Sequence, residues 1–167
     1  HYFLQWQELS AKDDSAARAT TFINRFWRKH QPSEIVIDFR DEIEGYNWYD
    51  AELDGRWAGP GKVSTVKLPA LRKGRYELYL DIVDAQAPEI ITDMDMSLNG
   101  NPLQTTVDGE GYPAMVFSEF AVENAAQQPV WEFQFKFPKL ISPAQHGSTD
   151  NRHLAIRVRT LKLRVTS

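Results

Sequence analysis

The chain has 167 residues, of which 42% are hydrophobic and 25% charged, a composition that suits one globular domain with a sizeable core. Its net charge of −4 disfavours nucleic acid and anionic membrane surfaces as partners, because either would need a basic face. The sequence has no cysteine, which excludes disulfides, thiolate metal sites and cysteine nucleophiles.

The beginning of the chain carries no recognisable targeting segment. Residues 1–10 lack the charged and apolar regions of a signal peptide, and no apolar run approaches the ~20 residues of a membrane span. We therefore expect a cytoplasmic location. The chain starts with His1 rather than Met, which indicates a piece of a longer protein.

One amphipathic helix is predicted over about residues 14–30. Asp14 or Ser15 suits its N-cap, and Pro32 ends it. Apolar side chains recur at helical spacing, at Ala19, Phe22, Ile23, Phe26 and Trp27. We expect this stripe to pack on the domain's own sheet, and docking on a preceding domain is the alternative. Residues 1–33 are therefore interpreted as an N-terminal arm and helix that pack on the following domain or link it to a preceding one.

From Glu34 onward the hydrophobic pattern changes to period two. Residues 35–39, 76–82, 94–98 and 131–137 alternate apolar with polar side chains, which is typical of antiparallel sheets with one buried side. The dipeptide Asn99-Gly100 predicts a tight turn within a hairpin over residues 96–103. The predicted fold is all-β: an antiparallel two-sheet, jelly-roll-like β-sandwich over 34–167 with one N-terminal α-helix.

The last predicted strand, over residues 154–165, changes parity part of the way along. Leu154, Ile156 and Val158 face one way, whereas the later apolar residues, from Leu161 onward, have the opposite parity. One face can bury both sets only if an extra residue is inserted, so a β-bulge is predicted near Arg159-Thr160.

Residues 46–69 concentrate the chemistry of the chain. Aromatic side chains, acids and an arginine occupy its first dozen residues, and a Gly-Pro-Gly break follows at Gly59. Trp48, Tyr49 and Trp57 have the flat faces on which sugars stack, and Asp50, Glu52 and Arg56 have groups that bind hydroxyls. The alternative is that the two tryptophans anchor the loop, which we favour for Trp57.

Catalytic constellations are incomplete. The alternating acids Asp50, Glu52 and Asp54 lie too close together for an inverting pair of glycosidase carboxylates, and a solvated surface explains them better. No convergent zinc ligands, nucleophile elbow or phosphate-binding glycine loop is present. A calcium loop is a weaker alternative, because the usual Asp spacing is missing. We expect no enzymatic activity, cofactor or metal.

Several motifs then resemble one family. They are Trp48-Tyr49-x-x-Glu52, Gly55-Arg56-Trp57-x-Gly59-Pro60, Leu68-Pro69, Leu98-Asn99-Gly100, Ser142-Pro143 and Asp150-x-Arg152-x-Leu154. This set is similar to a β-sandwich accessory domain joined to bacterial glycosyltransferases and other surface-polysaccharide assembly proteins. Asn47 and Ala155 stand where that family usually has glycine.

The resemblance implies a non-catalytic, carbohydrate-binding-like module whose partners are a glycan and a parent glycosyltransferase domain. It adds Asp150 and Arg152 to the candidate glycan-binding residues. Their more ordinary role is to tie the long loop 138–151 to the Trp48–Trp57 loop by ion pairs, with Glu52–Arg56 or Glu52–Arg152 as the expected pair. The rival functions are a docking or oligomerisation module without glycan binding, and a hydrolase that uses Glu52 or Asp150.

Overall fold

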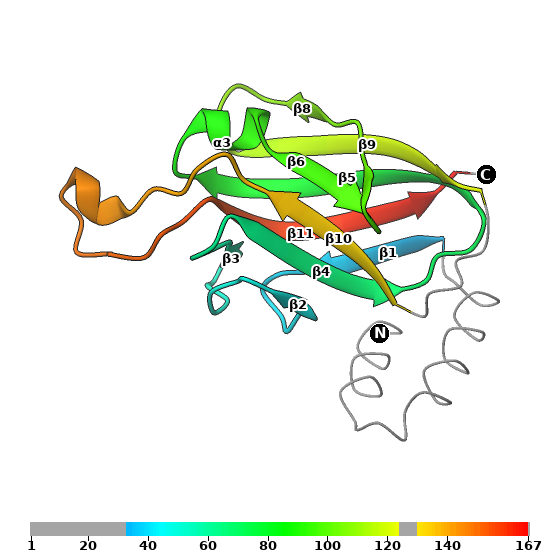
Figure 1. The fold of residues 1–167 in the computed structure, drawn as a ribbon, viewed down its shortest axis with the longest axis horizontal. Helices are drawn as coiled ribbons and strands as arrows, with labels where there is room; N and C mark the ends of the chain where they lie inside the picture. Colours follow the sequence, from blue (N-terminus) through cyan, green and yellow to red (C-terminus); the bar gives the residue numbers. More distant parts are fainter. Residues whose placement is uncertain (1–32, 124–129, 167) are drawn as a thin grey trace, which may run out of the picture.

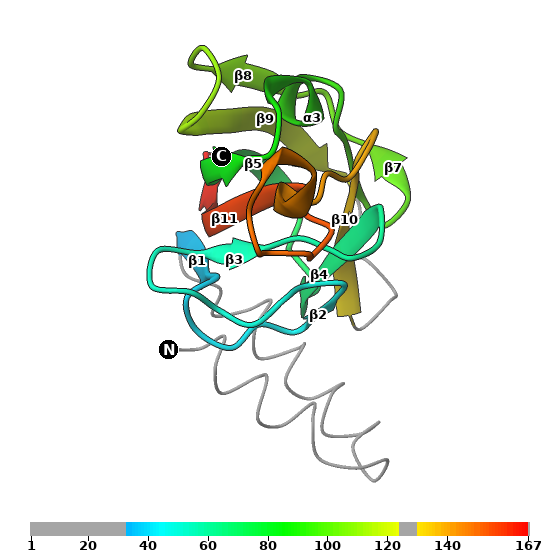
Figure 2. The same cartoon turned by 90° about the vertical axis from the view of Figure 1, so that its left-hand side faces the viewer.

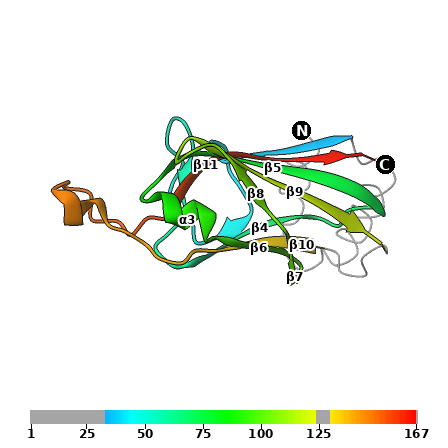
Figure 3. The same ribbon diagram turned by 90° about the horizontal axis from the view of Figure 1, so that it is seen from above.

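The computed structural model describes residues 33–123 and 130–166, which form two antiparallel sheets packed face to face (Figures 1 and 3). The first sheet has the order β1-β11-β5-β9-β8, and β3 also pairs with β11. Its strands are β1 (Glu34–Asp38), β3 (Arg56–Trp57), β5 (Gly74–Ala85), β8 (Thr106–Asp108), β9 (Ala114–Val122) and β11 (Ile156–Val165). The predicted all-β sandwich is confirmed.

The second sheet has the order β2-β4-β10-β6-β7. Its strands are β2 (Gly45–Tyr46), β4 (Val63–Pro69), β6 (Asp95–Leu98), β7 (Asn101–Pro102) and β10 (Val130–Lys136). Two short helical segments complete the described fold, α3 (Pro88–Thr92) and the 3-10 turn η1 (Pro143–His146). The helix α3 was not predicted. The predicted helix over 14–30, with its apolar stripe, lies outside the described residues.

The core lies between the inner faces of the sheets, and the alternating residues fill it as expected. Leu78 and Leu80 of β5 face inward from one sheet, and Phe133 and Phe135 of β10 from the other; all four are fully buried. The intervening residues of both strands are only partly buried or exposed. Period-two alternation thus sorts each strand into one core face and one outer face.

The predicted bulge is present in β11. Val158 pairs with Ile82 and Thr160 with Asp81, so Arg159 is an extra residue opposite β5. The insertion returns Leu161 to the buried face that Val158 occupies. The parity change read from the sequence therefore has the expected cause.

The predicted hairpin is also confirmed. Leu98 pairs with Asn101, and the two turn residues Asn99 and Gly100 have φ of 49° and 80°. Both lie in the left-handed region that Asn and Gly tolerate best.

Long connections gather at one end of the sandwich. The segment 138–154 projects from the left of Figure 1, and backbone hydrogen bonds between Ile141 and Leu154 close its base. In Figure 2 the same segment projects toward the viewer, and Arg152, just after the loop, pairs with Glu52 at 3.1 Å. The two loops that the sequence singled out are therefore neighbours in space.

Candidate functional site

The Trp48–Trp57 stretch folds back on itself as a small hairpin. Trp48 forms a bridge with Ala58, and the Tyr49 N–H donates to the Trp57 carbonyl at 3.0 Å. A further bridge joins Glu52 to Gly55 at the tip. Because β3 pairs with β11, the hairpin is fixed to the first sheet and its side chains have defined positions.

Trp48 anchors the loop to the core. Its indole N–H donates to the Thr65 carbonyl of β4 at 2.9 Å. Its ring packs 4.9 Å from Phe39 and edge-on, at 5.9 Å, to Phe135. Its polar group and much of its ring surface are thus engaged inside the protein.

Trp57 is buried as well, with only 5% of its surface exposed. The Arg157 guanidinium lies over its ring at 5.3 Å, within cation–π range. These contacts fit the interpretation of Trp57 as an anchor, because neither face of a buried ring is open to a sugar.

Arg56 joins its own strand, β3, to two other segments of the chain. Its guanidinium donates to the carbonyls of Phe39, Tyr49 and Asp41 at 3.1, 3.0 and 2.7 Å. Burial lowers the pKa of Arg56 below its usual value, and the charge of the exposed Asp50 opposes that change. The side chain is thus used to fix backbone, and it does not form the alternative ion pair with Glu52.

Glu52 is the centre of an ion-pair network. Its two carboxylate oxygens accept from Arg152 at 3.1 Å and from Arg157 at 3.3 Å. Arg157 also pairs with Asp54 at 3.2 Å and Asp84 at 3.5 Å. The expected Glu52–Arg152 pair is present, and it joins the hairpin to the segment that precedes β11. The Glu52–Arg157 pair joins the hairpin to β11 itself.

Asp150 completes the network from the long loop. Its carboxylate accepts a bidentate pair from Arg152, at 3.0 Å to Nε and 2.7 Å to Nη2. These hydrogen bonds lower the pKa of Asp150 and raise that of Arg152. The Asp-x-Arg motif therefore ties loop 138–151 to the hairpin, as its ordinary role implies.

Tyr49 has a covered ring. The Arg152 guanidinium lies 5.3 Å from the ring centre, and the Tyr49 hydroxyl accepts from the His153 N–H at 3.3 Å. The ring edge also approaches Gly59, where a Cβ would meet Tyr49 Cε2 at 2.7 Å and the His153 carbonyl at 2.1 Å. Tyr49 is half-buried and closes the seam between the two loops.

One residue that was not among the predicted site residues, Tyr46, occupies the open side of this region. Tyr46 is 77% exposed, and it stands at the rim of a depression of the surface, named here the β2 depression. The residues that line the β2 depression include Tyr46, Trp48, Arg56, Pro60 and Lys62.

Asn47 explains how the depression keeps its shape. Its side chain donates to the Gly61 carbonyl at 2.7 Å and to Ser64 Oγ at 2.9 Å, and it accepts from the Gly61 N–H at 2.7 Å. Its φ is 67°, in the left-handed region where glycine is favoured. Glycine would adopt this φ without strain, and Asn tolerates it better than most other side chains.

The site has no visible catalytic arrangement. Asp150 and Glu52 are both paired with arginines, and the lowered pKa of Asp150 keeps it ionised, whereas a general acid needs a raised pKa. Within residues 33–123 and 130–166 no three His, Asp or Glu side chains come together as metal ligands. The helices in the described part are too short or too polar to span a bilayer.

Comparison with known proteins gives structural neighbours only. Neither a family model nor a curated protein matches the sequence. A family 35 carbohydrate-binding module from Clostridium thermocellum aligns at 12% identity and a TM-score of 0.47, covering 79% of this chain and 98% of its own. A CBM35 from Cellvibrio japonicus Abf62 aligns at 8% identity and 0.46, covering 81% and 95%.

A larger protein, the GH26-CBM35 β-(1,4)-mannanase of Podospora anserina, aligns at 7% identity and a TM-score of 0.46, over 81% of this chain and 28% of its own. At such identities and TM-scores the likeness concerns the arrangement of the strands and carries no argument about ligands or residues.

Proposed function

We propose that this chain is a non-catalytic, carbohydrate-binding-like accessory module of a larger bacterial glycan-assembly protein, associated with a glycosyltransferase. The observation that carries the proposal is the exposed ring of Tyr46 beside polar groups on the β2 depression. A flat apolar face next to hydrogen-bonding side chains is the arrangement on which a sugar ring stacks.

The candidate residues then divide into two kinds. Trp48, Tyr49, Glu52, Arg56, Trp57, Asp150 and Arg152 make contacts inside the protein that hold the loops in place. Tyr46, Asp50 and Lys62 are exposed and stay available to a ligand. The first set would preorganise the second, which lowers the ordering cost of binding.

The charges on this face suit an anionic or hydroxyl-rich sugar. Lys62 is exposed at the rim, and Arg56 lies nearby in the wall. A uronate or another acidic sugar would meet a cation here, and the hydroxyls of a neutral sugar would find donors. Such a shallow face fits weak binding, with a dissociation constant on the order of millimolar to tens of micromolar, about −4 to −7 kcal/mol.

The test is a glycan-array screen of the whole chain, followed by NMR titration of the best oligosaccharide against wild type and Tyr46→Ala. We expect Tyr46→Ala to weaken binding about tenfold, because a stacking face is lost, and to leave the melting temperature unchanged. Tyr112→Ala is the matched control: Tyr112 is another exposed tyrosine, at 43%, outside the depression. It should bind as wild type does.

Equal affinity of Tyr46→Ala and wild type would contradict the assignment of the site. If no array glycan binds and no resonance moves at saturating sugar, the module binds no glycan, and a docking or oligomerisation role replaces the proposal. The surface gives that role less support. Among the described residues the large exposed apolar side chains come from four separate segments, at Val36, Tyr46, Leu53 and Tyr112.

A further inference from the structure

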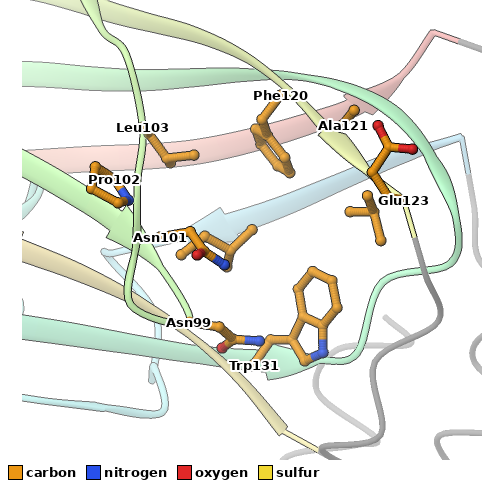
Figure 4. A pocket seen from close by; sticks show the side chains of 10 residues that line it. Asn99, Asn101, Pro102, Leu103, Phe120, Ala121, Glu123 and Trp131 are labelled. Atoms are coloured by element: carbon orange, nitrogen blue, oxygen red, sulfur yellow. The ribbon is translucent and has the colours of Figure 1, made fainter.

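A second depression lies at the other end of the sandwich. It is bounded by the β6–β7 hairpin, the end of β9 and the start of β10, and we name it the hairpin pocket (Figure 4). Its volume of about 430 Å³ falls within the range of small-molecule sites.

The register of β10 separates the two depressions. Val63, at the β2 depression, pairs with Lys136 at one end of β10, whereas Trp131, in the hairpin pocket, lies near the other end. Five residues of strand separate Lys136 from Trp131, about 17 Å. The hairpin pocket is therefore distinct from the site proposed above.

Half-buried Phe120 gives the hairpin pocket its aromatic wall, and the buried Trp131 also lines it. Trp131 is 5% exposed, and its six-membered ring extends from β10 toward Phe120 (Figure 4). Phe120 is stacked on Tyr76 at 5.5 Å and meets Phe133 edge-on at 6.5 Å, so its position is fixed from two sides. The wall is rigid before any ligand arrives.

Polar groups form the rim. The side-chain oxygen of Asn99 accepts from the Glu132 N–H at 2.9 Å, which fixes its amide and leaves its NH₂ group without a partner among the described residues. Asn101 and Glu123 are exposed, and neither side chain has a hydrogen bond or ion pair within the described part. One carboxylate and two amides thus border the aromatic wall, with Glu123 on the side opposite Asn99 and Asn101 (Figure 4).

This combination matches a neutral sugar. Aromatic rings contact the C–H face of a pyranose, while amides and a carboxylate bind its hydroxyls as donors and acceptors. No Lys or Arg is among the described residues that line the pocket, so an anionic ligand would face Glu123 without a compensating cation. The buried Trp131 N–H lacks an acceptor in the described part, and in Figure 4 it lies away from Asn101, so we assign it no ligand.

We propose that the hairpin pocket is a second carbohydrate subsite, which takes a neutral hexose residue and rejects uronic acids. The two subsites then differ in charge preference, because Lys62 and Arg56 border the first and Glu123 borders the second. One polysaccharide chain that reached both would bind with avidity, since the second contact becomes intramolecular.

The test is an NMR titration of the whole chain with methyl glycosides of glucose, galactose and mannose, and with methyl glucuronide as the anionic match of the glucoside. We expect at least one neutral glycoside to shift the side-chain amides of Asn99 and Asn101 and the indole N–H of Trp131. Methyl glucuronide should leave them in place. No shift with any neutral glycoside at about 100 mM, well above a millimolar dissociation constant, would overturn the proposal.

Two exposed substitutions sharpen the result. Asn101→Ala should weaken binding of the active neutral glycoside about fivefold, through loss of a hydrogen bond. Glu123→Gln should weaken binding of the neutral glycoside about threefold, because an amide oxygen is a weaker acceptor than a carboxylate, and it should admit methyl glucuronide, since the negative charge is removed. Asn151→Ala, an exposed asparagine outside the pocket, is the control and should bind as wild type does.

Unchanged affinity in Asn101→Ala, or equal rejection of the glucuronide by wild type and Glu123→Gln, would overturn the site. The outcome also separates the two proposals. Shifts confined to Tyr46 and Lys62 would retain the proposed function and remove the second subsite. Shifts confined to the hairpin pocket would retain the second subsite and would remove the β2 depression as a glycan-binding site.

Discussion

Arg56 provides the sharpest test of how the loop end is held together. Its guanidinium bridges three backbone carbonyls from two segments, those of Phe39, Asp41 and Tyr49. Replacing Arg56 with Ala removes all three hydrogen bonds while leaving the strands themselves unchanged. The carbonyls of Phe39 and Tyr49 are then left in a partly buried place without a donor.

The size of the loss follows from the environment of each bond. The two bonds to Phe39 and Tyr49 are partly buried, and a hydrogen bond from a charged donor contributes about 1.5 kcal/mol or more. The bond to Asp41 is exposed, so water replaces most of it. Arg56→Ala should therefore lower the free energy of unfolding by about 3 kcal/mol. For a chain of this size that corresponds to a fall in Tm of about 6–12 °C.

Urea unfolding followed by circular dichroism and tryptophan fluorescence measures this change. Arg56→Lys keeps the charge and loses the forked geometry, so it should lose most of the same stability, about 2 kcal/mol. Arg40→Ala is the control, because within the described part of the chain the exposed Arg40 side chain pairs only with Asp38, two residues away, and the urea midpoint of this variant should not move measurably. A midpoint for Arg56→Ala equal to that of wild type would refute the anchoring role and return Arg56 to the candidate ligand contacts.

Two further predictions concern the same end of the sandwich. Because hydrogen bonds from Arg152 lower the pKa of Asp150, the stabilisation from its carboxylate is present above about pH 4 and is lost as the pH falls through the lowered pKa. Wild type should therefore be more stable than Asp150→Asn at pH 7, and the gap between their urea midpoints should be smaller at about pH 3. A constant difference at both pH values would contradict this. Asn47→Ala should lower the free energy of unfolding by about 2–4 kcal/mol, because three hydrogen bonds are lost and alanine is strained at the positive φ. Asn47→Gly should lower it by about 1 kcal/mol less, because glycine loses the same hydrogen bonds without the strain. Equal stability of the two variants in thermal unfolding would show that φ at this position is without strain.

The sandwich could be predicted because its signals are local. Alternation within residues 76–82 or 131–137 depends only on neighbours two positions apart, and one buried face is enough to produce it. The bulge at Arg159 was predictable for the same reason. When the apolar residues of one strand change parity, an inserted residue is the usual way to keep them all on the buried face. Helix α3 was missed because its five residues are too few to show a helical period.

The roles of the loop side chains were harder to predict because their partners are distant in sequence. Trp48 binds a carbonyl 17 residues away, and Glu52 pairs with Arg152 and Arg157 about a hundred residues away. Composition revealed that aromatic and charged groups gather at residues 48–57. It did not reveal that most of them are satisfied inside the protein, by backbone carbonyls and by arginines that the pairing of β3 with β11 brings near.

A group that binds a ligand must be free of partners inside its own protein, and this condition decides which residues of the loop end remain candidates. Arg152 covers one face of the Tyr49 ring, the Trp48 N–H donates to a backbone carbonyl, and Arg56 donates three hydrogen bonds to backbone carbonyls. Each of these contacts removes a group from the possible ligand set and adds rigidity to what is left. Tyr46 meets the condition on this side of the sandwich, and Asn101 with Glu123 meets it on the other. The dense motif therefore describes mainly a frame: Tyr46 stands at its beginning, and Asn101 and Glu123 lie outside it.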